Sequence, residues 1–412
     1  MDLIEKQNNK VDKAIIPALR FPDFVNDGEW NYVNGNELFE PIVNKNHNSD
    51  LPVLAITQDQ GAVPRDMIDY NVIVSDKSIA GYKVVEVGDF IISLRSFQGG
   101  IEYSYYKGLC SPAYIVLRRK NELICNDFYR HYFKSARFIQ DLNRNLEGIR
   151  DGKMVSYQQF STIRIPLPPL AEQRRIAACL SALDEMLAAT NGKLEQLKAY
   201  KKGLMQNLFN QRGGVINNIN KFVVGRLRFP EFYNEKEWEE KKLGEIITTL
   251  SPTKKLQSGK YKAVGSFPIV DQSQNYICGY SDDVEAVVNT TSENLIVFGD
   301  HTCTLKFVDF PFIQGADGIK IFKSSKSNEI DERFLYQALL YNPIVSKEYK
   351  RHFSELKEQV VCYPKDMNEQ RKIASCLSSM DDQINAYTEK VGLLGQYKKG
   401  LMQRMFPQNQ MN

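Results

Sequence analysis

The chain has 412 residues, of which 42% are apolar and 25% are charged, and its formal net charge is +3. This length suits two or three domains, and the composition is that of an ordinary globular protein. No run of ~18 apolar residues occurs, which argues against a transmembrane helix, and the acid-containing start Met1–Lys6 does not look like a signal peptide. Seven scattered cysteines without a Cys-x-x-Cys pair favour reduced thiols, so we expect a cytoplasmic protein without disulfides or a metal site.

The first 165 residues predict an α+β module. Short β-branched runs indicate strands, and a helical pattern follows them: strands over 51–56, 84–87, 90–94 and 114–117, and a helix over 127–142. Polar and aromatic side chains lie between the strands, and such side chains read base edges or hold phosphates. For any single residue an ordinary exposed polar group is the simpler alternative. The candidates for DNA contact are Gln58, Arg65, Arg95, Gln98, Tyr105 and Lys107.

A long helix is predicted after Pro166, Pro168 and Pro169, which would end any earlier helix. From Ile176 to Leu208 apolar residues recur at spacings of three and four, which is typical of a coiled coil. A helix of about 38 residues would be about 57 Å long at ~1.5 Å per residue.

The second half of the chain repeats the first. Residues 172–181 recur at 369–378 and residues 200–206 at 397–403, both with an offset of 197. A period this long indicates a duplicated domain, because solenoid and propeller repeats are only about 20–50 residues long. Two short motifs also recur: Leu-Arg-Phe-Pro at 19–22 and 227–230, and Gly-Asp at 88–89 and 299–300, with offsets of 208 and 211. Matched ends around divergent interiors predict one scaffold that carries two different binding surfaces.

The second interior is again predicted as α+β, with strands over 295–298 and 318–322 and a helix over 331–349. We expect base reading in the segment around His301, Thr302, Thr304 and Lys306, since it follows a strand that ends at Gly299-Asp300, where a turn can present side chains to a groove. The candidates for DNA contact in this half are Lys254, Lys255, Gln272, Gln274, His301, Thr302, Thr304 and Lys306.

The chain thus divides into four segments: a first module (1–165), a helical spacer (166–212), a linker with the second module (213–362) and a second helical spacer (363–412). Neither helix can bury its apolar stripe alone. Each could pack on its own module, but stripes that match in length and position favour pairing of the two helices, antiparallel to each other.

No catalytic motif is found in either half. The sequence contains no Gly-x-x-x-x-Gly-Lys-Ser/Thr phosphate loop, no Gly-x-Gly-x-x-Gly, no His-Glu-x-x-His and no Gly-x-Ser-x-Gly. An enzyme is therefore disfavoured.

The repeated helical blocks resemble a known family. The Pro-Leu-Pro-Pro-Leu-Ala-Glu-Gln lead-in (166–173), the two Glu-Gln-Arg helix starts and the two Tyr-Lys-Lys-Gly-Leu-Met-Gln ends are similar to the specificity subunit of type I restriction–modification systems. The Gly-Asp-His-Thr (299–302) and Gly-Ala-Asp-Gly (315–318) motifs add to this resemblance, which covers nearly the whole chain. The second copy departs from the pattern at 363–367, where the proline-rich lead-in is missing.

The resemblance implies a non-catalytic subunit with two target-recognition domains. Each would read one half of a bipartite, asymmetric site in double-stranded DNA, residues 20–165 one half and residues 226–362 the other. The helices would fix the gap and dock two methyltransferase subunits, which bring S-adenosylmethionine. Two endonuclease subunits, which use ATP and Mg, would complete the complex, while this chain would bind no cofactor itself. The helix positions expected to contact partner subunits are Glu172, Gln173, Arg174, Tyr200, Lys201, Lys202, Glu369, Gln370, Arg371, Tyr397, Lys398 and Lys399.

Two alternatives stay open. The chain could be a bivalent protein–protein scaffold without DNA contact, or, less favoured by the missing motifs, a stand-alone DNA-modifying enzyme. The salt dependence of binding distinguishes the scaffold from a DNA-binding subunit. DNA binding weakens steeply with added salt because it releases phosphate counterions, whereas an apolar protein interface is not affected in this way.

Overall fold

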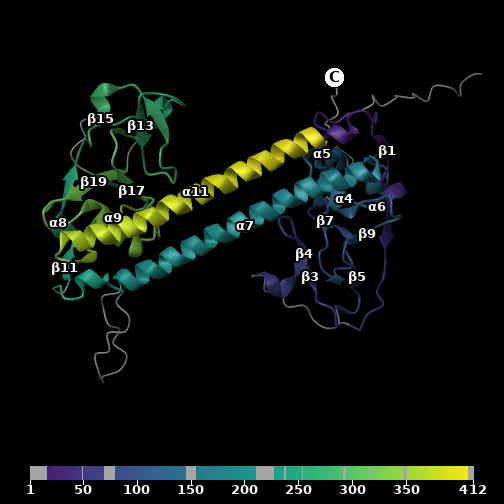
Figure 1. The fold of residues 1–412 in the computed structure, drawn as a ribbon, viewed down its shortest axis with the longest axis horizontal. Helices are drawn as coiled ribbons and strands as arrows, with labels where there is room; N and C mark the ends of the chain where they lie inside the picture. The colour runs from purple at the N-terminus through teal and green to yellow at the C-terminus, as the bar shows by residue number, and fades with distance from the viewer. Residues whose placement is uncertain are drawn as a thin grey trace, which may run out of the picture. The chain divides into compact units, whose positions relative to one another are not determined.

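The computed structural model describes residues 16–48, 50–68, 79–144, 155–209, 227–235, 238–252, 254–290, 294–315, 318–346 and 350–406. The chain forms two compact units: unit 1 comprises residues 1–190 and 390–412, and unit 2 comprises residues 191–389. Each long helix therefore contributes one half to each unit (Figure 1). Within the described ranges, no helix combines the length and apolarity that crossing a membrane requires.

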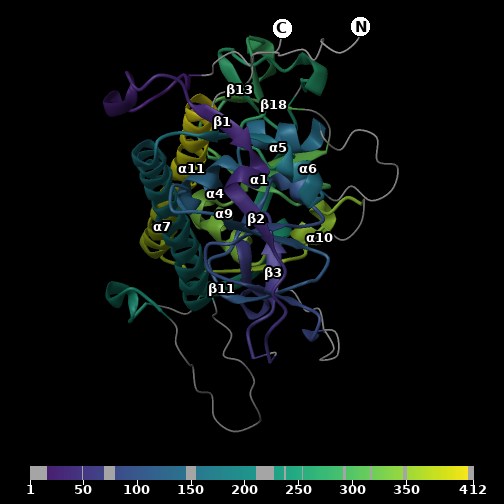
Figure 2. The ribbon, with the colours of Figure 1, turned by 90° about the vertical axis from the view of Figure 1, so that its right-hand side faces the viewer.

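The α+β domain of unit 1 opens and closes with one antiparallel strand pair, β1 (Asn31–Asn34) and β10 (Arg164–Leu167). A four-stranded antiparallel sheet lies between them, in the order β2 (Phe39–Ile42), β9 (Ile115–Arg119), β6 (Phe90–Ile92) and β7 (Glu102–Tyr103). A second layer has the order β4 (Gly61–Pro64), β3 (Leu54–Thr57), β8 (Gly108–Cys110) and β5 (Lys83–Val85), in which β3 reaches β8 through the single parallel bridge Val53–Leu109. Figure 2 shows β1, α1 (Gly35–Leu38), β2 and β3 following one another along one side of this unit.

The first sheet is buried on both faces, which explains its continuous apolar strands. In β6, Phe90 and Ile92 face the core formed with the helices, whereas Ile91 between them faces the second layer. Phe39 anchors the helical side, with ring centroids 5.4 Å from Phe90 and 5.2 Å from Tyr129. The helices on this side are α4 (Asn126–Tyr132), α5 (Ala136–Arg144) and α6 (Tyr157–Ser161), so the helix expected over 127–142 is divided into two.

Unit 2 repeats this frame. The pair β11 (Glu239–Lys242) and β20 (Val360–Tyr363) bounds the domain. The first sheet has the order β12 (Ile247–Leu250), β19 (Ile319–Ser324), β16 (Leu295–Gly299) and β17 (Leu305–Val308). The second layer, complete here, has the order β14 (Gly279–Ser281), β13 (Phe267–Val270), β18 (Phe312–Gln314) and β15 (Val287–Val288). The helices are α8 (Leu243–Ile246), α9 (Glu332–Tyr341) and α10 (Phe353–Lys357). Both domains are α+β and share one strand order, which confirms the duplication.

One predicted equivalence is wrong. Gly88-Asp89 precedes β6, whereas Gly299-Asp300 ends β16, the matching strand of unit 2. The two aspartates also have different partners. Asp89 accepts two hydrogen bonds of 2.7 Å from Arg118, and Asp300 accepts from the backbone N–H groups of His352 and Phe353 at the start of α10. A two-residue motif is too short to define a structural position by sequence offset.

The predicted long helices are confirmed as α7 (Leu170–Phe209) and α11 (Met367–Met405). In unit 1 the start of α7 packs against the end of α11, with Ile176, Ala177 and Leu180 in the same core as Met405 and Phe406. In unit 2 the roles are exchanged, because the end of α7 shares a core with the start of α11.

One ion pair joins the two helices in each unit. Lys398 binds Asp184 in unit 1, and Lys201 binds Asp381 in unit 2 at 2.5 Å. The helices are therefore antiparallel within each unit, and their starts also pack on their own α+β domains. Both packing modes considered from the sequence are present.

Candidate nucleic-acid interface

Two loops meet in unit 1 and carry several of the predicted DNA contacts. We call them the paired loops of unit 1: the β3–β4 turn (residues 58–60) and the β6–β7 connection (residues 93–101). Gln58 lies on the first, and Arg95 and Gln98 on the second, and all three side chains are exposed. The Gln58 Nε2 donates to the Arg95 carbonyl at 3.4 Å, and a Cβ added to Gly99 would lie only 2.8 Å from Gln58 Cδ. The fold thus brings together residues 37 positions apart in sequence.

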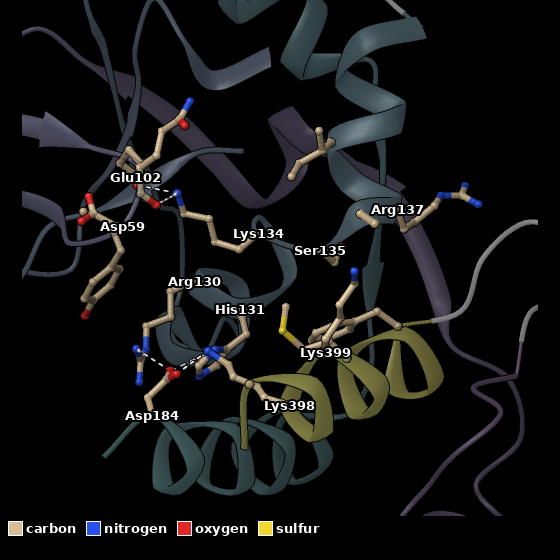
Figure 3. Close-up of a pocket in the computed structure, with 18 of the residues that line it drawn as sticks. Asp59, Glu102, Arg130, His131, Lys134, Ser135, Arg137, Asp184, Lys398 and Lys399 are labelled. Carbon is tan, nitrogen blue, oxygen red and sulfur yellow. Dashed lines mark hydrogen bonds and ion pairs between the residues drawn. The ribbon is translucent and has the colours of Figure 1, made fainter. Parts of the chain in front are cut away.

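Tyr105 extends this surface toward two cations that the sequence reasoning missed. Its hydroxyl accepts a hydrogen bond of 2.7 Å from Arg130, a residue of α4. Lys134 donates to the Gln58 carbonyl at 3.1 Å and to Glu102 at 2.6 Å, as Figure 3 shows for the Glu102 pair. The sequence pattern does not mark Arg130 and Lys134, because they lie on or just after a helix and not between strands.

Glu102 is almost completely buried beneath these loops. Burial raises the pKa of its carboxyl to about 7, although Lys134 opposes the shift. Nearby, burial lowers the pKa of His131 to about 3, so this imidazole is neutral at physiological pH. The positive charge of the region therefore comes from Arg and Lys side chains.

The corresponding connections meet in unit 2 as well. The paired loops of unit 2 are the β13–β14 connection (residues 271–278) and the β16–β17 turn (residues 300–304). Gln274 Nε2 donates to Thr304 Oγ1 at 3.2 Å, and Thr302 Oγ1 donates to the Gln272 carbonyl at 2.7 Å. His301 lies on the second loop and its ring bonds the Lys350 carbonyl. Five predicted residues of this half thus lie on the two loops: Gln272, Gln274, His301, Thr302 and Thr304.

Lys306 is not available to read a base, and this prediction is corrected. The residue lies in the strand β17 and is only 3% exposed. The Nζ donates to the carbonyls of Asp271 and Asn275 at 2.7 and 2.6 Å, so it holds the first paired loop of unit 2 in place. Burial also lowers the pKa of this amine, although Cys278 and Asp271 oppose the shift. Strand alternation turned the lysine inward, which the sequence offset could not reveal.

Four other candidates lie outside the paired loops. Arg65 is half-buried at the start of η2 (Arg65–Met67), after β4. Lys107 pairs with Glu86 at 2.9 Å. Lys254 pairs with Asp283 at 2.6 Å, and its exposed neighbour Lys255 lies in the same segment after β12.

Four of the residues expected to contact partner subunits are internal instead. Glu172, Gln173, Glu369 and Gln370 are completely buried. In unit 1 both Glu172 oxygens accept hydrogen bonds of 2.7 Å from Arg20, and in unit 2 both Glu369 oxygens accept equivalent bonds from Arg228. The Leu-Arg-Phe-Pro motif and the Glu-Gln motif, which recur with different offsets, are thus contact partners.

The glutamines attach each helix start to its own α+β domain. Gln173 accepts from the backbone N–H of Cys125 and donates to the carbonyls of Leu123 and Pro168. Gln370 makes the matching three bonds, with the N–H of Asp331 and the carbonyls of Glu329 and Pro364. Side chains engaged in this way cannot contact a second protein at the surface.

The remaining helix positions are accessible or lie in the ion pairs between helices. Lys201 and Lys398 make the two ion pairs described above. The exposed set is Arg174, Tyr200, Lys202, Arg371, Tyr397 and Lys399.

Comparison with known proteins gives concordant matches. A family model for the type I restriction modification DNA specificity domain matches residues 26–199 and 235–392. The chain is 26% identical over 364 residues to the type I restriction enzyme MjaVIII specificity subunit of Methanocaldococcus jannaschii, covering 77% of this chain and 78% of that protein. It is 26% identical over 156 residues to the EcoR124I/EcoR124II specificity subunit of Escherichia coli, covering 36% of this chain and 38% of that protein.

A solved structure shares the fold. The crystal structure of the type I restriction–modification system S subunit from M. genitalium has a TM-score of 0.62 with this chain, at 17% sequence identity. The match covers 97% of this chain and 100% of that one.

Proposed function

Because this chain belongs to the type I restriction–modification DNA specificity family, we propose that it reads a bipartite, asymmetric DNA target through its two α+β domains. As a specificity subunit it is the recognition component of such a system and not a catalytic one. In the proposal, the domain of unit 1 reads one half-site and the domain of unit 2 reads the other.

One observation carries this proposal: the same two strand connections meet in both units but present different side chains. Unit 1 offers Gln58, Arg95 and Gln98 there, whereas unit 2 offers Gln274 and Thr304. Arg and Gln side chains can form paired hydrogen bonds with base edges in the major groove, and a Thr hydroxyl can form a single one. A common frame with unlike loops suits two half-sites of unlike sequence.

We also propose how partners assemble on the chain. Two methyltransferase subunits dock on the exposed side chains of α7 and α11, where Tyr200 and Tyr397 occupy equivalent repeat positions and are 63% and 59% exposed. Two like surfaces on one chain suit two like partners. S-adenosylmethionine enters with the methyltransferase subunits, and ATP and Mg enter with two endonuclease subunits, so this chain needs no cofactor of its own.

The test is a domain exchange whose boundaries follow from the fold. Residues 243–359, between the paired strands β11 and β20, are replaced by the equivalent segment of another such subunit with a different known target. Methylated sites are then mapped in cells that contain the methyltransferase subunits. We expect one half-site to change and the other to persist, and the reciprocal exchange of residues 35–163 between β1 and β10 is the control. If both half-sites change together, or neither changes, the domains do not read DNA independently.

A protein–protein scaffold predicts a different result. DNA affinity of the complex should fall steeply with salt if phosphates are contacted, because each contact releases counterions. If the affinity of the complex for DNA does not depend on salt, the protein–protein scaffold is favoured over a DNA-binding subunit.

A further inference from the structure

Unit 1 contains a cavity of about 780 Å³ next to its paired loops. Its walls come from five parts of the unit: the β3–β4 turn, the strand β7 with the following Tyr105, the segment from α4 to α5, Asp184 of α7, and the end of α11. Gln58 and Tyr105 lie both on the candidate DNA surface and on the cavity wall. The cavity is therefore continuous with that surface.

The cavity has an excess of positive charge. Arg130, Lys134, Arg137, Lys398 and Lys399 line it, against the three acids Asp59, Glu102 and Asp184. These cations differ in how many of their N–H donors remain available to a ligand.

Most of these cations already have partners inside the unit. Arg130 donates to Asp127, Tyr105 and Ser181, and Lys398 binds Asp184. Lys134 donates two hydrogen bonds, so one N–H of its ammonium group is left.

Lys399 is the exception among them. It is exposed on α11 at the edge of the cavity (Figure 3), and its Nζ has no hydrogen-bond or ion-pair partner among the described residues. A lysine with three uncommitted donors next to a partly satisfied one is suited to an anionic ligand.

Unit 2 does not repeat this arrangement. The helices α4 and α9 can be aligned because Cys125 N–H donates to Gln173 and Asp331 N–H donates to Gln370. In that alignment Tyr336 and Leu340 occupy the positions of Arg130 and Lys134. The repeat counterpart of Lys399 is Lys202, which is exposed and does not line the cavity. The two lysines therefore share a motif but not an environment.

We propose that Lys399 and Lys134 bind backbone phosphates of the DNA strand that flanks the half-site read by unit 1. This proposal rests on the proposed function. It adds that the end of α11, which is far from the recognition domain in sequence, is part of the DNA-binding surface of that domain. Phosphate contacts position a protein on DNA without reading its sequence. Lys399 thus contributes affinity and orientation, while the paired loops discriminate bases.

The experiment compares Lys399→Gln with Lys202→Gln in the full chain assembled with its methyltransferase subunits. Affinity for a duplex with the mapped target, and for a scrambled duplex, is measured from ~50 to ~200 mM salt. We expect Lys399→Gln to reduce the slope of log affinity against log salt by ~0.9, the value for one lost phosphate contact. At ~0.1 M salt this corresponds to roughly eightfold weaker DNA binding. The loss should be equal on both duplexes. Lys399→Arg should keep the wild-type slope, and so should Lys202→Gln when complexes of equal methyltransferase content are compared.

Three results would overturn the proposal. The first is an unchanged slope in Lys399→Gln, and the second is an equal loss in Lys202→Gln. The third is a lower methyltransferase content of the Lys399→Gln complex, measured by its mass, with unchanged DNA affinity of the complete complexes. In that case the lysine binds a protein partner. Failure of the underlying function is recognised separately, because the wild-type complex would then not prefer the target duplex over the scrambled one.

Discussion

Replacing Arg228 by alanine should lower the free energy of unfolding of unit 2 by about 3–5 kcal/mol, the usual cost of breaking a buried ion pair by removing one partner. Glu369 is completely buried and accepts both of its hydrogen bonds from Arg228, each 2.7 Å long. In unit 1 an indole also donates to the matching Glu172, from Trp30 at 3.0 Å. The Trp238 indole nitrogen has no such acceptor within the described part of unit 2. The variant would therefore leave a buried carboxylate without a donor.

The matched control is an exposed pair of the same length. Lys242 and Glu358 are also 2.7 Å apart in unit 2, but their side chains are 53% and 70% exposed. Water and salt screen such a pair, so Lys242→Ala should leave the unfolding midpoint unchanged. Because the two ion pairs have the same length, the difference between the two variants measures the effect of burial.

The assay uses the two tryptophans, Trp30 in unit 1 and Trp238 in unit 2. In a Trp30→Phe background, Trp238 fluorescence during urea unfolding reports on unit 2 alone. Combining Arg228→Met with Glu369→Leu should restore most of the lost stability, because an apolar pair needs no charge compensation. If Arg228→Ala and Lys242→Ala shift the midpoint equally, the buried pair does not anchor the helix start and the reasoning is wrong.

Three further predictions follow from single positions. Leu180→Asp and Leu377→Asp should each place a carboxylate in a completely buried site and unfold their own unit, detected by the fluorescence of that unit's tryptophan; loss of structure in both units from one change would contradict it. Lys306→Ala should free the carbonyls that it binds, so hydrogen exchange should accelerate in residues 271–278, while an unchanged rate would show that the loop is held otherwise. Glu102 has a folded-state pKa raised from 4.5 to about 7 by burial, so its folded form keeps a proton that the unfolded chain releases. Stability should therefore decrease by roughly 3 kcal/mol as pH rises from about 4.5 to about 7, and Glu102→Gln should remove that dependence in urea unfolding at several pH values.

The placement of individual polar residues could not be predicted from the sequence, although their general region could. The paired loops contain Gln58, Arg95, Gln274 and Thr304, all named from their position between strands. Lys306 was named by the same reasoning and is buried, because the strand β17 turns its side chain toward the interior. When both faces of a sheet are covered, the alternation of side chains along a strand does not reveal which residues stay exposed.

The sequence by itself determined the duplication, the two long helices and the α+β character of both modules. These features depend on local patterns: an offset shared by ten consecutive residues, and apolar spacings of three and four that continue along a helix. Only the tertiary structure decided what the repeated motifs do. The Glu-Gln motif looked like a surface for partners, but folding places it under the Leu-Arg-Phe-Pro segment, where Glu172 and Glu369 bind Arg20 and Arg228. Such contacts join residues more than 140 positions apart, and burial of a charge depends on what the rest of the chain packs over it.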